Sequence, residues 1–84
     1  MIFLIEFDRA KERLITFSKF ADADREDAED RRLKIELELH RQGIDHEVVL
    51  LEAVNEDLLR RTHRRYFEGV SSMLESAAAA ALRG

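Results

Sequence analysis

Two apolar segments near the start of the chain are typical of β-strands. Residues 2–8 and 13–20 are rich in aromatic and β-branched side chains, which strands favour. In the first segment apolar residues occupy both alternating faces, because successive side chains of a strand point to opposite sides. The polar residues 9–12 are few enough to close a hairpin, although they contain no Asn-Gly or Asp-Gly pair. We therefore predict two antiparallel strands joined by a short turn.

The next segment, residues 22–42, is predicted to form a long helix. Asp22 or Asp24 can cap its start, and acidic residues crowd its first turns. Arg41 lies in its last turn and Gly43 follows, as expected at a helix end.

One part of this helix, residues 33–39, also has the pattern of a strand. Apolar and charged residues alternate there without a break, which is the strand period of two. We favour the helix because Leu, Lys and Glu are good helix formers and both ends carry helix signals. On a helix the apolar residues fall on two sides, one with Leu33 and Leu37 and the other with Ala28, Ile35 and Leu39.

The second half of the chain predicts one more strand and one more helix. Residues 46–53 are apolar on both alternating faces, as in a central strand. Asn55 can cap a helix over residues 56–68, and Gly69 stands where a C-terminal cap belongs. Residues 70–84 include five consecutive Ala, so they form either a third helix or a frayed tail.

These elements predict an α+β fold, with one compact domain over residues 1–69 and a C-terminal tail over 70–84. We expect a three-stranded sheet with the first strand between the other two, because strands joined through a helix run parallel. With the helices on one face, the other face of the sheet stays open, and an exposed apolar patch usually marks an interface. Either the C-terminal tail folds back over this face or a second copy of the protein covers it. We favour the second copy, because a two-fold homodimer is the commonest oligomer. The expected dimer interface consists of Ile2, Leu4, Val48 and Leu50.

An arginine-rich face on the helix 56–68 is the candidate binding surface. Its four members are Arg60, Arg61, Arg64 and Arg65. Guanidinium groups bind phosphate and carboxylate groups through a planar fork, so this face could bind a nucleic acid or an acidic protein partner. Acidic residues four positions away, such as Glu56 before Arg60, favour the simpler interpretation of a solvated face that pairs with itself.

Composition excludes several kinds of site. The 84 residues carry a net charge of −4, which argues against general nucleic-acid binding. Cys is absent, so no thiolate can bind zinc or act as a nucleophile. The three His do not occur at metal-ligand spacing, and no glycine-rich phosphate loop is present, so we expect neither a metal nor a cofactor. No secretory signal or membrane-spanning stretch is apparent, and we expect a cytoplasmic protein.

The sequence thus favours a small non-enzymatic interaction, regulatory or adaptor protein that acts as a homodimer. The alternative is binding of a nucleic acid or another polyanion through the arginine face. An enzyme that uses His63 with a nearby carboxylate as a general base has little support, because no nucleophile or acid–base motif accompanies this residue.

Overall fold

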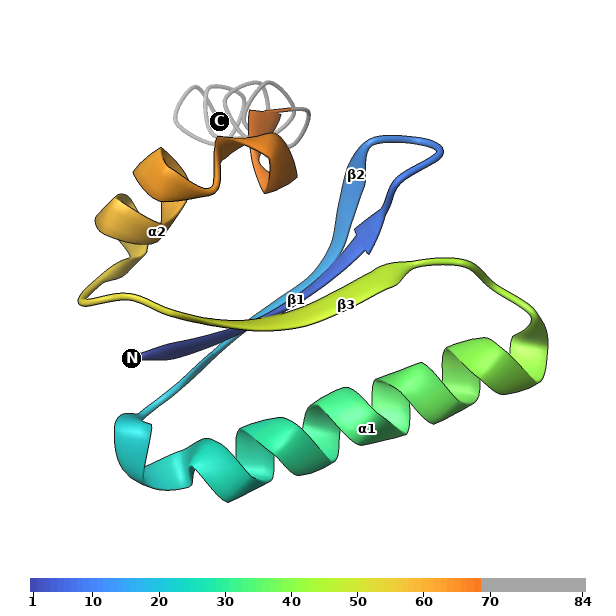
Figure 1. The fold of residues 1–84 in the computed structure, drawn as a ribbon, viewed down its shortest axis with the longest axis horizontal. Coiled ribbons are helices and arrows are strands. Elements are labelled where there is room, and N and C mark those ends of the chain that lie inside the picture. Colours follow the sequence, from blue (N-terminus) through green and yellow to red (C-terminus); the bar gives the residue numbers. More distant parts are fainter. Residues whose placement is uncertain (69–84) are drawn as a thin grey trace, which may run out of the picture.

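A computed structural model describes residues 1–68 (Figure 1). In chain order the elements are β1 (Ile2–Asp8), β2 (Arg13–Phe20), the 3₁₀ turn η1 (Asp22–Asp24), α1 (Arg25–Gln42), β3 (Glu47–Glu52), α2 (Glu56–Thr62) and the 3₁₀ turn η2 (Arg64–Tyr66). The α+β class with a three-stranded sheet is confirmed. The predictions made for Gly69 and for the tail 70–84 lie outside the described residues.

β1 is the middle strand of the sheet, whose order is β2-β1-β3. It pairs antiparallel with both neighbours, so β2 and β3 run in the same direction, as predicted for strands joined through a helix. β3 is an edge strand, not the central strand that its apolar pattern indicated. Its two faces are apolar because each of them packs against a different helical segment.

The face of the sheet with the odd-numbered residues of β1 carries the main apolar core. The buried members of this core are Phe3, Ile5, Phe7, Leu59, Tyr66 and Phe67. Tyr66 meets the ring of Phe7 edge to face, with ring centroids 5.3 Å apart, and Phe67 meets Phe17 in the same way at 5.5 Å. Aromatic pairs prefer this geometry, so the segment after α2 is anchored to the sheet by both rings.

α2 ends at Thr62, six residues before the predicted end at 68. The hydroxyl of Thr62 donates to the carbonyl of Leu58 at 2.9 Å, a local bond that competes with helix continuation. The backbone then departs from helical geometry at His63 (φ −126°, ψ 50°) and continues as η2. Beyond this interruption, both Tyr66 and Phe67 are buried in the core.

α1 covers the opposite face of the sheet, which corrects our expectation that both helices lie on one face. Figure 1 shows the sheet between α1 on one side and α2 with η2 on the other. The even-numbered residues Ile2 and Leu4 have no exposed surface. Their neighbours on β3, Val48 and Leu50, are half-buried. The surface that we expected these four residues to offer to a second copy is therefore covered by α1 of the same chain.

The helical interpretation of residues 33–39 is confirmed, because they lie within α1. Asp24 occupies the N-cap position, although its side chain makes no capping hydrogen bond. Gly43 ends the helix in the left-handed conformation (φ 69°), and its N–H donates to the carbonyl of His40 at 3.2 Å. The left-handed conformation costs less free energy for glycine than for residues with a Cβ atom, which explains why Gly43 stands directly after the last turn.

Candidate functional site

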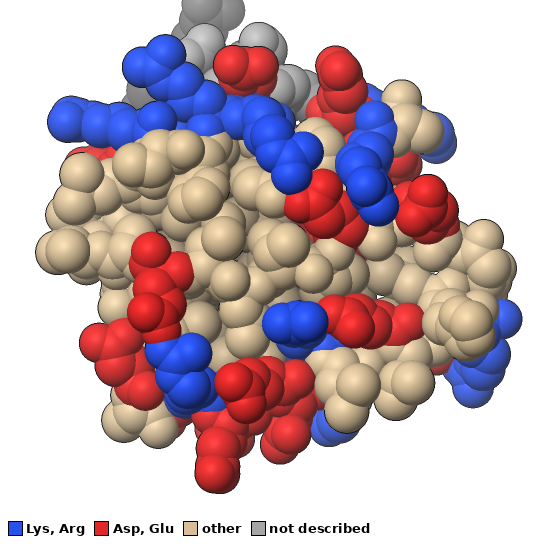
Figure 2. All heavy atoms as spheres, viewed as in Figure 1, with Lys and Arg blue, Asp and Glu red and all other residues tan. Residues whose placement is uncertain are grey.

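The four predicted arginines do not form one continuous face. Arg60 and Arg61 belong to α2, whereas Arg64 and Arg65 belong to η2 beyond the interruption at His63. Figure 2 shows Lys and Arg side chains gathered over this end of the molecule, while Asp and Glu predominate around the first turns of α1. The cations are thus close together, but their individual surroundings differ.

Arg60 is held within the chain. Its Nε donates to Glu56 Oε2 at 3.0 Å, the i,i+4 pair that the sequence predicted. Its guanidinium lies over the Phe67 ring, 4.7 Å from the centroid. Lys19 of β2 approaches Glu56 at 3.0 Å, and the hydrogen bond from Lys19, followed by that from Arg60, lowers the pKa of Glu56. Arg60 therefore stabilises the packing of α2 against the sheet.

Arg65 is also held within the chain. Its Nη2 donates to Glu47 Oε2 at 2.7 Å and lies 2.8 Å from the hydroxyl of Tyr66, which itself donates to Glu47. Burial raises the pKa of Tyr66, and Glu47 raises it further because the carboxylate accepts the phenol proton in a hydrogen bond. Arg65, Tyr66 and Glu47 thus connect η2 to the first residue of β3.

Titration of Tyr66 tests this connection. We expect a pKa above the ordinary value of 10.0, a lower pKa in Glu47→Gln, and a higher pKa in Arg65→Ala, because the guanidinium favours the phenolate. Tyr66 is the only Tyr and Trp is absent, so absorbance titration reports on this residue alone. Equal pKa values in the wild type and Glu47→Gln would show that the contact is not made in solution.

Arg61 and Arg64 are the exposed remainder of the predicted arginine face. Within residues 1–68, Arg60 pairs with Glu56 of its own helix and Arg65 pairs with Glu47 of β3, whereas neither Arg61 nor Arg64 takes part in an ion pair. A polyanion at this surface would therefore meet two guanidinium groups that are outside the ion pairs of residues 1–68, instead of four.

A buried polar cluster lies on the α1 side of the sheet, and sequence reasoning missed it. Glu6 is only 7% exposed, and its carboxylate accepts a hydrogen bond from Thr16 Oγ1 at 2.9 Å. His46 Nδ1 lies 2.7 Å from the other carboxylate oxygen, and His46 Nε2 lies 3.5 Å from Asp8. The cluster joins β1 and β2 to His46, the residue that directly precedes β3, through satisfied polar groups, which supports the register of the strands.

The sequence did contain a signal for this cluster. Glu6 shares a strand face with Ile2 and Leu4, so a helix that covers those residues also buries the carboxylate. A buried carboxylate requires a hydrogen-bonding partner, and the antiparallel register brings the start of β3 to the end of β1. The signal could not be used without knowing that α1 covers this face.

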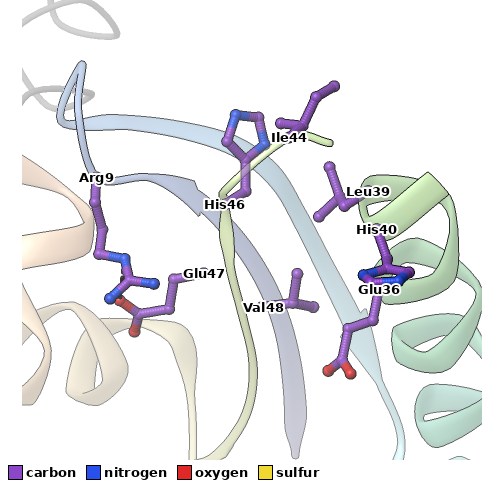
Figure 3. Close-up of a pocket in the computed structure, with 8 residues that line it drawn as sticks. All are labelled: Arg9, Glu36, Leu39, His40, Ile44, His46, Glu47 and Val48. Carbon is purple, nitrogen blue, oxygen red and sulfur yellow. Dashed lines mark ion pairs between the residues drawn. The ribbon is translucent and has the colours of Figure 1, made fainter. Parts of the chain in front are cut away.

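A shallow groove of about 400 Å³ separates the last turns of α1 from the first residues of β3 (Figure 3). The residues around it are Arg9, Glu36, Leu39, His40, Ile44, His46, Glu47 and Val48. Figure 3 shows Arg9 and Glu47 on the other side of β3 from Val48 and His40. Glu36 is paired with Arg32 at 2.7 Å, and His46 is paired with Glu6, so neither group is free to act alone on a ligand.

The remaining histidines do not converge. His40 is exposed on α1, while His63 is half-buried between α2 and η2, with its ring centroid 6.3 Å from that of Tyr66. Among residues 1–68, no group of three or more His, Asp or Glu side chains is arranged to hold a metal ion. Over the same range, neither helix is both long enough and apolar enough to cross a membrane.

The outward face of α1 exposes two leucines. Their spacing was visible in the sequence, but we did not assign them to a site. Leu33 is 55% exposed and Leu37 is 59% exposed, on the side away from the sheet. The sheet side holds Ala28, which is fully buried, and Ile35 and Leu39, which are half-buried. Residues two apart on a helix lie about 200° apart, so the alternating pattern produces a helix with two apolar sides.

Comparisons with known proteins give no match: no family model fits the chain, and no curated protein or solved structure is detectably similar to it.

Proposed function

We propose that this chain is a small non-enzymatic interaction protein that acts as a homodimer, with the outward face of α1 as its contact surface. One observation carries the proposal: Leu33 and Leu37 lie together, one turn apart, on a helix whose other side already packs against the sheet. Exposed leucines at i and i+4 lie next to each other on a helix and are typical of a helix-to-helix contact.

The location of the interface differs from the sequence-based expectation, while the functional class stays the same. The four residues first expected at the interface are covered by α1, so this face of the sheet does not need a second copy to cover it. The exposed apolar surface lies instead on the outer side of α1, the helix that covers the sheet. A second copy is the occupant that we favour, because two-fold dimers are the commonest oligomers and each copy supplies an identical leucine pair.

Polyanion binding remains a second candidate with narrower support. Arg61 and Arg64 are exposed and close in sequence, but Arg60 and Arg65 are already paired with carboxylates. Affinity for a nucleic acid grows with the number of phosphates neutralised, so two guanidinium groups without an ion pair inside residues 1–68 give little. The absence of enzymatic activity and a cytoplasmic location stay predictions of the same proposal.

Concentration-dependent NMR tests the proposed surface. Amide signals of wild-type protein, recorded over a dilution series, are expected to shift at residues on the outward side of α1 and to stay constant in α2 and η2. The physical reason is that only nuclei near the contact change environment when dimers dissociate. Shifts confined to the β2 edge or to residues 60–65 would contradict the proposal.

A further inference from the structure

A regular stripe of exposed residues runs along the outward side of α1. Asp30, Leu33, Leu37 and His40 are spaced by three, four and three residues, and all four are exposed. Alternating spacings of three and four are those of a two-helix seam, in which the same side of each helix faces the other. α1 has 18 residues and is therefore about 27 Å long, enough to present the whole stripe to a partner helix.

The two ends of this stripe carry side chains of different chemistry, an acidic one at Asp30 and an imidazole at His40. Asp30 lies in an acidic first half of the helix that also contains Glu26, Asp27 and Glu29. His40 lies in the last turn, where the helix dipole favours a cation. The ion pairs of α1 within the described part of the chain are Arg25–Glu52, Arg32–Glu36 and Arg41–Glu38, and none of them engages Asp30 or His40.

The orientation of the two helices decides which of these groups meet. In a parallel pair each residue faces its own copy, so Asp30 would face Asp30 and the two helix dipoles would be aligned. In an antiparallel pair with the two-fold axis beside Ile35, residues equally far from position 35 face each other. Leu33 then faces Leu37 of the second copy, and Asp30 faces His40 of the second copy, twice per dimer. The antiparallel arrangement also places each acidic helix start beside a helix end.

We infer that two copies pair through α1 in an antiparallel, two-fold arrangement, with Leu33 packed on Leu37 of the second copy and Asp30 placed against its His40. This inference rests on the proposed function and adds to it the orientation and register of the contact. The partner is a second copy of this chain because the stripe is complementary to itself: its leucines lie at the centre, and the groups at its two ends match only when one helix is reversed.

Disulfide cross-linking between single-cysteine variants tests the register. The chain contains no Cys, so any disulfide formed must join the introduced residues. Asp30→Cys and His40→Cys are oxidised separately and as an equimolar mixture, at a concentration where the wild type is dimeric. In the mixture we expect a cross-linked dimer with one chain of each kind, identified by mass spectrometry as a 30–40 disulfide. The other Asp30–His40 contact of that dimer stays intact.

The separate variants provide the control. In the antiparallel pair, position 30 lies ten residues along the axis from its own copy, or about 15 Å, beyond the roughly 7 Å limit between Cα atoms of a disulfide. We therefore expect little cross-linking of either variant alone. Both substitutions are on exposed positions, and circular dichroism verifies that each variant is folded.

Each other outcome has a distinct meaning. Cross-linking of each variant with itself would show parallel pairing and overturn the inference, while leaving the proposed dimer in place. The absence of a mixed disulfide from a protein that sediments as a dimer would reject the register. A wild type that stays monomeric would reject the proposed function itself.

A charge exchange gives an independent readout of the same register. Asp30→Lys removes the carboxylate that faces His40 of the second copy, and His40→Glu places a second carboxylate against Asp30, so each is expected to weaken dimerisation. The double variant is expected to restore it, because each contact then joins opposite charges. In a parallel pair, or in one of different register, the double variant would be no better than the single ones.

Discussion

Replacing Leu59 by alanine is expected to lower the free energy of unfolding by about 2–5 kcal/mol, the usual cost of deleting a buried leucine. Leu59 is fully buried and is the residue of α2 that enters the core formed with Phe3 and Ile5. Truncation leaves a cavity that these side chains cannot fill without moving. For a chain with a core of this size, a loss of that magnitude is a large share of the total stability.

Leu58→Ala is the matched control for this prediction. It deletes the same atoms one position earlier on the same helix, but Leu58 is 41% exposed, so we expect a loss below about 1 kcal/mol. Urea unfolding followed by circular dichroism measures both variants. All samples must have one protein concentration, because dimerisation adds to the apparent stability. Equal losses for the two variants would mean that α2 does not pack on the sheet as described.

Replacing Leu37 by aspartate is expected to abolish dimerisation at micromolar concentration. The exposed part of the leucine side chain contributes about 1 kcal/mol of burial, and desolvating the new carboxylate costs at least about as much again. Since the dimer is symmetric, both terms apply once in each copy. Together they amount to about 4 kcal/mol, which corresponds to a roughly 1,000-fold larger dissociation constant. Sedimentation equilibrium measures this change directly.

Val54→Asp is the control for the aspartate substitution. Val54 is 80% exposed and lies between β3 and α2, outside the proposed contact. The Val54→Asp substitution introduces the same charge at an exposed apolar position. A general effect of lower hydrophobicity or greater net charge would therefore appear in this variant too. We expect Val54→Asp to dimerise like the wild type. Equal weakening in both variants would show that Leu37 has no specific role.

The local pattern of the sequence predicted the elements well, because each carries a signal of its own. The strand 2–8 and the helix that ends before Gly43 follow from side-chain type and spacing alone. The end of α2 did not follow, because the 3.6-residue period of residues 56–68 continues through His63. It is the docking of Tyr66 and Phe67 on the sheet, a tertiary contact, that accompanies the break.

The faces of the sheet were harder to assign than its strands. Both faces of β1 are apolar, so the pattern could not tell which of them α1 and α2 would cover. The assumption that both helices share one face made Ile2 and Leu4 the candidate interface and left the partly buried pair Glu6–His46 unnoticed.

The alternating residues 33–39 were informative for a different reason. The strand-like period on a helix distributes leucine and isoleucine over two opposite sides. One side is used by the sheet, and the other has no partner within residues 1–68. The feature that made the secondary structure ambiguous is thus the one that indicates a second contact surface.

Sedimentation equilibrium of the wild-type protein tests the central claim most directly. Over a range from about 1 µM to about 300 µM, which spans the dissociation constants of moderate helix-to-helix contacts, the mean mass should rise from that of one chain towards that of two. The best fit should be a monomer–dimer equilibrium without larger species, because a two-fold contact is closed. The mass of one chain at every concentration would contradict the account.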